Sequence, residues 1–229
     1  MTVIGRAELA GPAPALAPGL LGARLVRDDE TGRREGRIVE VEAYAGPGDL
    51  ASHARAGPTP RNRVMFGPPG HAYVYLVYGM YDCLNVVTGV TGEASAILIR
   101  AVEPLIGIER MRTDRLAVER RKARVRTADG EAVAQARLAA TPPGRLAAGP
   151  GLVGACFGLN TSWTGTDLCD PSSTLRLERD PRLDDALPPE AIRATPRIGV
   201  AYAGPDWSQR PWRFLIAGHP SVSGTAAAH

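Results

Sequence analysis

Apolar and polar residues alternate over residues 36–45, and this period of two predicts a β-strand. The run Gly46-Pro47-Gly48-Asp49 contains turn-forming residues and should end that strand. A polar loop over residues 50–70 follows. Comparable patterns predict further strands at residues 72–78, 84–88, 94–102, 175–178, 197–203 and 213–217.

Two other segments have the pattern of helices. Glu103-Pro104 should open a helix with Leu105, Ile108 and Met111 on one stripe, because proline is favoured in a first helical turn. Residues 150–159 predict a short buried helix that begins at a proline. Strands and helices without regular β-α-β alternation predict an α+β fold with an antiparallel sheet.

The chain has 229 residues, enough for one sizeable core, and we expect a single domain over residues 1–229. Residues 1–19 are rich in Ala, Gly and Pro and are interpreted as a lead-in. Residues 113–148 are basic and then Ala- and Pro-rich, which fits either a partly helical excursion or a loop. No apolar run approaches the roughly 20 residues that span a bilayer, and no signal peptide is recognisable, so we expect a cytoplasmic protein that does not contact membranes.

The basic residues are unusual in kind, because all of the 27 except Lys122 are arginines. Arginine suits bidentate contacts with phosphate, although a GC-rich coding bias explains much of its abundance. With a net charge of only +3, the composition is compatible with nucleic acid without establishing it. The three cysteines and four histidines have no metal-site or disulfide spacing, so we expect no metal and no cofactor.

The predicted strand at residues 36–45 carries the first candidate chemistry. Glu40, Glu42 and Tyr44 share one face, with neighbours roughly 6.5–7 Å apart. Hydrolysis of a nucleoside needs such a pair, since an aromatic ring can stack on the base while a carboxylate orients a water. The simpler alternative is a solvated face that carries two glutamates.

Arg100 and Asn85 are polar residues within apolar runs. A buried guanidinium needs an anionic partner, and Glu40 and Glu42 are the obvious candidates for Arg100, in a structural ion pair or a functional one. Asn85 has a donor and an acceptor that suit reading of a base edge, or it is a satisfied core amide.

Five of the six tyrosines lie between residues 44 and 81. By parity Tyr75 and Tyr78 point to opposite faces of their strand, so one ring could line a pocket while the other projects from the turn at Gly79-Met80. A projecting Tyr78 or Met80 could wedge into a base stack, whereas ordinary core packing is the alternative. Lys122, the only lysine, lies in the basic excursion, which argues against a Schiff base and for direct attack by water.

Six stretches together resemble the alkyladenine DNA glycosylase family, also called methylpurine DNA glycosylases. They are Gly36–Tyr44, Asp49–His53, Thr59–Phe66, Tyr73–Tyr81, Leu98–Pro104 and Arg197–Val200. The similarity runs from about Leu20 to Ser223 and skips residues 113–148. Its specificity comes from the order and number of the stretches, because no single one is diagnostic.

The resemblance implies roles for individual residues. Glu42 matches the general base that activates water, and Arg100 matches the arginine that helps position that water. Asn85 matches the residue that crowds the exocyclic amine of normal guanine. The implied base pocket consists of Tyr44 on one face of the flipped base, His53 and Tyr75 on the other, and Asn85, Leu98, Val200 and Ala201.

We further expect Tyr78 and Met80 to intercalate into the duplex from a protruding hairpin on a curved antiparallel sheet. The residues expected to contact the DNA backbone are Thr59, Arg61, Asn62, Arg63 and Tyr81. One departure from the family pattern is Leu152, where members often have lysine, and a contact with DNA could be lost there.

The resulting hypothesis is a monofunctional DNA N-glycosylase, acting as a monomer on double-stranded DNA. It would flip out and excise alkylated or deaminated purines, namely alkyladenines and hypoxanthine, with ethenoadenine as a further candidate. Two alternatives stay open from the sequence: an inactive nucleic-acid-binding module, which would not need Glu42, and a hydrolase of free nucleosides, which would not need Tyr78.

Overall fold

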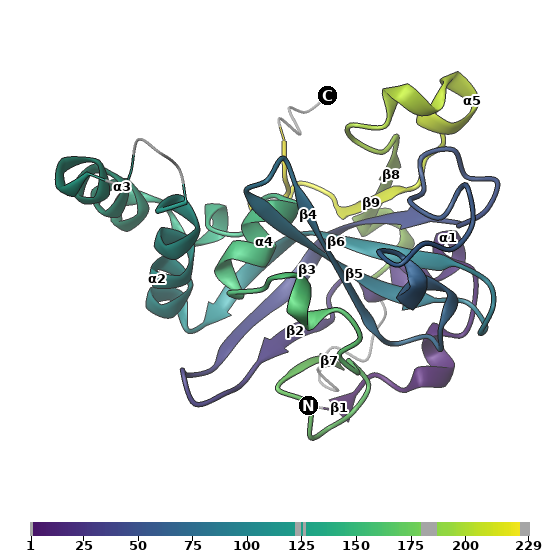
Figure 1. Cartoon of the computed structure of the whole chain (residues 1–229), viewed down its shortest axis with the longest axis horizontal. Coiled ribbons are helices and arrows are strands. Elements are labelled where there is room, and N and C mark those ends of the chain that lie inside the picture. The colour runs from purple at the N-terminus through teal and green to yellow at the C-terminus, as the bar shows by residue number, and fades with distance from the viewer. Residues whose placement is uncertain (1, 122–124, 126, 180–186, 225–229) are drawn as a thin grey trace.

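Two long antiparallel strands form the centre of the fold in the computed structural model, which describes residues 2–121, 125, 127–179 and 187–224 (Figure 1). These are β3 (Arg34–Tyr44) and β6 (Ser95–Ile106), which pair along most of their length. The other strands are β1 (Thr2–Val3), β2 (Arg24–Arg27), β4 (Ala72–Val77), β5 (Tyr81–Thr88), β7 (Leu175–Arg179), β8 (Ile192–Thr195) and β9 (Arg213–Ile216).

Short helices surround this sheet. The α-helices are α1 (Ala13–Leu16), α2 (Ile108–Glu119), α3 (Ala128–Ala140), α4 (Pro150–Cys156) and α5 (Pro205–Ser208). The described 3-10 helices are η1 (Arg6–Leu9), η2 (Ala17–Leu20), η3 (Arg63–Phe66), η5 (Pro143–Arg145), η6 (Thr161–Trp163), η8 (Pro189–Ala191) and η9 (Ala201–Ala203). None of the helices within the described ranges is long and apolar enough to span a bilayer.

The strand order is β1-β7-β2-β3-β6-β5-β4, and every described pairing is antiparallel. On the edge of β3 opposite β6, β2 pairs with the first residues and β9 pairs with Glu40–Glu42. Register shifts occur on both sides of Glu40 in the pairing with β6. Such irregularities bend and twist a strand, and the sheet accordingly curls. The predicted α+β class with a curved antiparallel sheet is confirmed.

The main core lies between the sheet, the N-terminal helices and α4. Ile38, Val41 and Ile99 of the sheet are fully buried together with Phe157 after α4. Helix α4 approaches β5 so closely that a Cβ on Gly154 would lie 1.9 Å from the carbonyl oxygen of Asp82. Only glycine fits there, so this contact holds α4 closely against β5.

The N-terminal segment contributes several side chains to this core, although residues 1–19 were interpreted from the sequence as a lead-in. Leu9, Ala13, Ala17 and Leu20 are at most 2% exposed, so the N-terminal segment contributes apolar contacts to the sheet.

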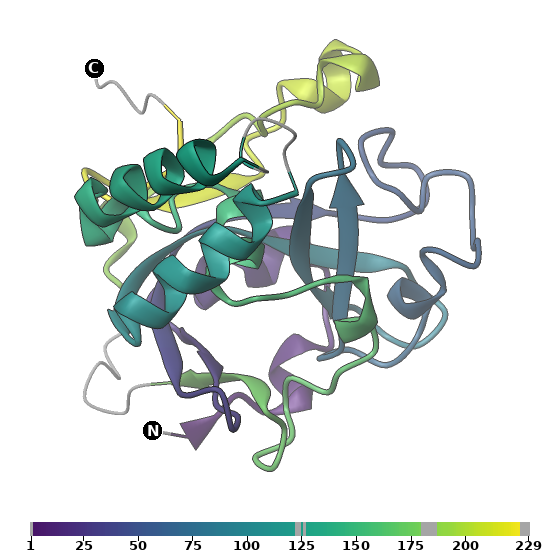
Figure 2. The ribbon, with the colours of Figure 1, turned by 60° about the vertical axis from the view of Figure 1, so that its left-hand side comes forward.

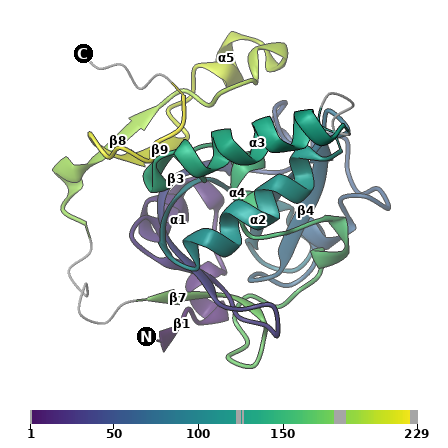
Figure 3. The same cartoon turned by 90° about the vertical axis from the view of Figure 1, so that its left-hand side faces the viewer.

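Helices α2 and α3 lie side by side at one end of the molecule (Figures 2 and 3). A small cluster of buried residues joins them: Leu116, Val125, Ala134 and Leu138. The described part of residues 113–148 is therefore mostly helical, which agrees with the first of the two interpretations. Lys122, on which the argument against a Schiff base rested, lies outside the described residues.

Two predicted elements are wrong. The helix expected to open at Glu103-Pro104 begins later, because these two residues continue β6 and pair with Arg37 and Gly36 of β3. Gly107, in a left-handed conformation (φ 76°), then turns the chain into α2.

The strand expected at residues 197–203 is also wrong. The strand in this region, β8, ends at Thr195, and the chain continues as a loop and then η9. Arg197 leaves the sheet because its guanidinium is buried against Asp49, which no local pattern shows.

Candidate active site

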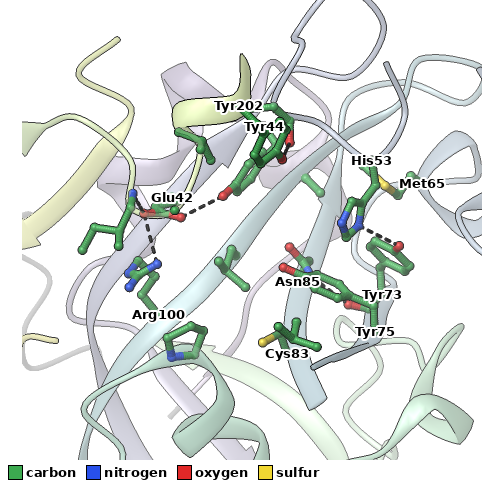
Figure 4. Close-up of a pocket in the computed structure, with 18 of the residues that line it drawn as sticks. Glu42, Tyr44, His53, Met65, Tyr73, Tyr75, Cys83, Asn85, Arg100 and Tyr202 are labelled. Atoms are coloured by element: carbon green, nitrogen blue, oxygen red, sulfur yellow. Dashed lines mark hydrogen bonds and ion pairs between the residues drawn. The ribbon is translucent and has the colours of Figure 1, made fainter. Parts of the chain in front are cut away.

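A cavity of about 260 Å³ opens between the C-terminal part of β3, strands β4–β6 and the loop at residues 198–202. Most of the residues implied for the base pocket and its chemistry line it together, and so does Tyr78, which was expected to intercalate into DNA. These residues are Glu42, Tyr44, His53, Tyr75, Tyr78, Asn85, Leu98, Arg100 and Val200. Figure 4 shows Glu42 and Arg100 on one side of the cavity, and His53, Tyr73 and Tyr75 on the other.

Glu42 is completely buried from bulk solvent at one wall of this cavity. Its Oε1 accepts hydrogen bonds from Arg100 Nη1 (3.1 Å) and from the backbone N–H of Ile198 (2.8 Å). Its Oε2 accepts one from the Tyr44 hydroxyl (2.8 Å). Burial and the nearby Glu42 raise the pKa of Tyr44 well above its usual value, so the hydroxyl stays protonated as the donor. The carboxylate is thus held in one orientation.

Arg100 lies between two glutamates. Its Nε donates to Glu40 Oε1 (3.0 Å), while Nη1 bonds Glu42. Burial alone would lower the pKa of Arg100, but the charges of Glu42 and Glu40 raise it. The predicted partners of Arg100 are confirmed. Because neither glutamate is exposed, the alternative of a solvated strand face is wrong.

The opposite wall consists of aromatic rings. His53 Nδ1 lies 3.0 Å from the Tyr73 hydroxyl, and its ring meets Tyr75 edge-on with centroids 4.4 Å apart. Partial burial, with Arg61 and Arg55 nearby, lowers the pKa of His53 to about 4. The His53 ring is therefore uncharged at neutral pH, and the guanidinium of Arg61 lies 5.6 Å from the Tyr75 ring centroid. An uncharged aromatic ring can face a cationic ring without repulsion.

The Tyr44 ring is in contact with the guanidinium of Arg197, which the sequence interpretation missed. The guanidinium of Arg197 lies 4.8 Å from the Tyr44 ring centroid and 5.0 Å from that of Trp212. Arg197 is also bonded to both carboxylate oxygens of Asp49, at 2.6 and 2.9 Å, and neither side chain is exposed. Arg197 and Asp49 lie 148 positions apart, so only the matched stretches Asp49–His53 and Arg197–Val200 hinted at their importance.

Other residues at the cavity were also missed. They are Ala51, Met65, Tyr73, Val77, Cys83, Ala96, Pro150, Ile198, Gly199 and Tyr202. Tyr202 closes part of the wall, because its hydroxyl donates to the carbonyl of Ala51 (3.0 Å) and joins two loops. Ala201, in contrast, is exposed and does not line the cavity.

Asn85 is buried at the cavity wall, and its Nδ2 donates to the carbonyl of Tyr73 (3.0 Å). The amide nitrogen of Asn85 therefore has a hydrogen-bond partner within the protein, while the residue still lines the cavity. Both sequence interpretations of Asn85 are therefore compatible with its position.

The residues expected to contact DNA are not equally accessible. Thr59, Arg61 and Arg63 are exposed, whereas Asn62 is only 2% exposed. The Asn62 amide holds the loop itself, through Thr59 N (2.6 Å) and the carbonyls of His53 and Gly57. Asn62 therefore braces the loop and does not reach the surface. Tyr81 is half-buried against Gly151 of α4.

Tyr78 is the most exposed large hydrophobic residue in the described ranges, at 89%, and it borders the cavity. It lies in the turn between β4 and β5 with a positive φ of 51°, whereas Met80 is half-buried. A left-handed conformation is unfavourable for a bulky residue and tends to occur where function requires it.

Comparisons with known proteins agree with this geometry. The model of a family described as "Methylpurine-DNA glycosylase (MPG)" matches residues 7–220. A protein of Methanocella arvoryzae named "Putative 3-methyladenine DNA glycosylase" is 43% identical over 223 residues, which cover 97% of this chain and 96% of that protein. A protein of Streptomyces avermitilis with the same name is 41% identical, over 97% of this chain and 91% of its own length.

A match over nearly the whole chain agrees with the resemblance that the six stretches carried. It favours a DNA glycosylase over both the inactive binding module and the hydrolase of free nucleosides. The chain belongs to the methylpurine-DNA glycosylase family, and it is a hydrolase of N-glycosyl bonds that removes alkylated bases from DNA in base excision repair.

Proposed function

We propose that the enzyme flips a damaged purine out of the duplex into the cavity, where Glu42 activates a water that displaces the base from its sugar. The observation that carries this proposal is the buried carboxylate of Glu42, held by Arg100 and Ile198 at the wall of an otherwise aromatic cavity. A buried carboxylate without such a cation would be strongly disfavoured. Arg100 therefore supports the ionised form that general-base catalysis needs.

The base would stack between Tyr44 on one side and His53 with Tyr75 on the other. Alkylation of a ring nitrogen gives the purine a positive charge, and π faces attract such cations. Arg197 keeps Tyr44 in place from behind, and the neutral ring of His53 adds no opposing charge. The pocket thus suits an alkylated purine, whose charge also makes it a good leaving group.

We propose that the enzyme is monofunctional and works as a monomer on duplex DNA. None of the described residues that line the cavity carries an amine that could form a Schiff base. The test is a single-turnover assay on a duplex with one 7-methylguanine. The product should be an intact abasic strand that is cut only after alkali, and borohydride should trap no protein–DNA adduct. Strand cleavage without alkali would overturn the monofunctional assignment.

Neutral lesions should be excised more slowly than cationic ones. Hypoxanthine or ethenoadenine must gain a proton to leave, but burial raises the pKa values of Tyr44 and Tyr75, and that of His53 is lowered to about 4. None of these side chains is a good acid at pH 7. Since general acid catalysis is worth roughly 100- to 10,000-fold, we expect hypoxanthine to be released at least about 100-fold more slowly than 7-methylguanine in single-turnover assays at pH 7. Equal rates would mean that an efficient proton donor exists.

Tyr78→Ala should slow base release by about 10- to 100-fold without lowering stability. Filling the gap left by a flipped base offsets an unstacking cost of a few kcal/mol, and Ala cannot fill that gap. The exposed ring contributes little to folding, and Ala has the same Cβ strain at φ 51°. Single-turnover rates and chemical unfolding measure the two effects. Tyr78→Phe is the matched control and should keep the wild-type rate; an unchanged rate in Tyr78→Ala would remove Tyr78 from the mechanism.

A further inference from the structure

A second carboxylate lies behind Glu42 and has its own cation. Glu40 is fully buried, and its Oε1 accepts hydrogen bonds from Arg100 Nε (3.0 Å), Arg213 Nε (2.6 Å) and Ser223 Oγ (2.9 Å). Its Oε2 accepts the backbone N–H of Ser223 (2.6 Å). Arg213 lies on β9, which pairs with β3 at the place where β2 no longer does.

The formal charges of this cluster balance only because Arg213 is present. Two buried carboxylates, Glu40 and Glu42, face two buried guanidinium groups, Arg100 and Arg213. Arg100 contacts both carboxylates, whereas Arg213 contacts Glu40. Without Arg213, one positive charge would serve two buried acids. In that situation one acid tends to bind a proton.

Other groups near Glu42 do not replace that charge. From β3 the neutral hydroxyl of Tyr44 donates to it, and from the loop after β8 the backbone N–H of Ile198 does so. From β4 and β5, Tyr75 and Cys83 are neutral, since burial raises the pKa values of both, that of Cys83 to about 12.

Two further charged side chains are near these neighbours. Asp82 is next to Cys83, and Arg121 Nη1, 3.3 Å from its carboxylate, balances its charge. Arg197 lies at the ring of Tyr44, where its bidentate partner Asp49 balances its charge.

We propose that Arg213 is a positioning residue for catalysis: it neutralises Glu40, which leaves Arg100 free to hold Glu42 in its ionised, water-activating form. This inference rests on the proposed role of Glu42 as the general base. Arg213 acts through Glu40 and Arg100, and the structure gives it no place at the cavity wall.

The C-terminal segment fixes this arrangement. Ser223 bonds Glu40 through both its backbone and its hydroxyl, and its carbonyl accepts Arg213 Nη2 (3.2 Å). Arg145 holds the same segment through the carbonyls of Pro220 and Val222, both at 2.9 Å. The segment thus closes the cluster against water, which keeps the charge balance significant.

The test uses variants that change the cluster charge in opposite directions. Arg213→Met makes it more negative, Glu40→Gln makes it more positive, and the double variant restores balance. The single-turnover rate of 7-methylguanine release from a duplex is measured from pH 5 to 9. Arg213 contacts Glu40 and is the register partner of Glu42 on β9. We therefore expect Arg213→Met to move the acidic limb of the pH–rate profile to higher pH, by about 1 pH unit or more, because loss of a cation from the cluster favours protonation of one of its two carboxylates. Glu40→Gln should move the acidic limb to lower pH, and the double variant should return it close to the wild-type pH.

Two further variants separate charge from structure. Arg213→Lys keeps the charge, so its acidic limb should stay near that of the wild type even if the plateau rate falls. Arg24→Met removes a buried arginine that pairs with Glu35 in the same sheet, away from the cavity, and should leave the limb in place. If Arg213→Met does not fold, as judged by chemical unfolding, the downward shift in Glu40→Gln and the fixed limb in Arg213→Lys still test the proposal.

The proposal is overturned if the limb stays in place in Glu40→Gln and Arg213→Met, or if both move it in the same direction. Arg213 would then be a structural brace. Failure of the proposed function looks different, because the wild type itself would release no base, or Glu42→Gln would release it at the wild-type rate.

Discussion

Replacement of Glu42 by glutamine should slow base release by about 100- to 10,000-fold, the usual contribution of general-base catalysis. Glutamine is nearly isosteric and keeps an oxygen that can accept from Arg100 or Ile198, but it cannot accept a proton from water. Binding of the lesion should persist, because the walls formed by Tyr44 and Tyr75 are untouched. The rate is measured in single-turnover assays with 7-methylguanine in a duplex, and binding is measured with a duplex that contains a stable abasic analogue.

The matched control for this variant is Glu35→Gln. Glu35 is another buried glutamate of β3 with arginine partners, Arg33 and Arg24, and it does not line the cavity. It should release base at the wild-type rate. If Glu42→Gln were as active as this control, another group would have to activate the water. If Glu42→Gln lost DNA binding together with activity, its effect would be one on folding or recognition.

The contact of Arg100 with two glutamates could be predicted from the sequence for a simple reason. Residues two apart on a strand point the same way, so Glu40 and Glu42 were expected on one face and were the obvious candidates to pair with Arg100. A lone arginine within an apolar strand needed a carboxylate partner. In the structure Arg100 forms ion pairs with both glutamates. Periodicity and the cost of burying a charge pointed to these ion pairs, whereas the roles of Glu42 and Arg100 in catalysis were implied only by the family resemblance.

The parts that could not be predicted depend on contacts between distant segments. Arg213 and Glu40 are 173 positions apart, and Tyr202 and Ala51 are 151 apart. Neither pair leaves a local pattern. The start of α2 was misplaced for a similar reason: Glu103-Pro104 has the local pattern of a helix start, yet pairing with β3 extends the strand through it. Tertiary contacts overrode local preference at that point.

One structural feature links the missed residues to the predicted ones. β3 changes partner from β2 to β9 near Glu40, and its pairing with β6 is irregular at the same place. This change brings Arg213 to the back of the carboxylates while the cavity stays in front of Glu42. The curl of the sheet therefore separates a charged side, which holds Glu42, the proposed general base, from an aromatic side, which would receive the purine.

Arg197→Met should destabilise the enzyme by about 3–5 kcal/mol, the usual cost of removing one partner from a buried ion pair. Asp49 would remain with no exposed surface and no cation, since Arg197 is its bidentate partner. Asp49→Asn should have a similar effect, because it leaves the Arg197 charge uncompensated. Chemical unfolding measures both, and Arg63→Met, which removes an exposed arginine, should change the free energy of unfolding by less than about 0.5 kcal/mol.

The double variant Asp49→Asn with Arg197→Met distinguishes the ion pair from simple packing. If the cost arises from an unpaired buried charge, the double variant should be more stable than the sum of the two single losses implies. Its activity should nevertheless stay low, because Tyr44 would lack the guanidinium that lies 4.8 Å from its ring centre, and the base would stack on a less constrained ring. Strictly additive losses with full activity would show that Arg197 supports neither the charge balance nor Tyr44.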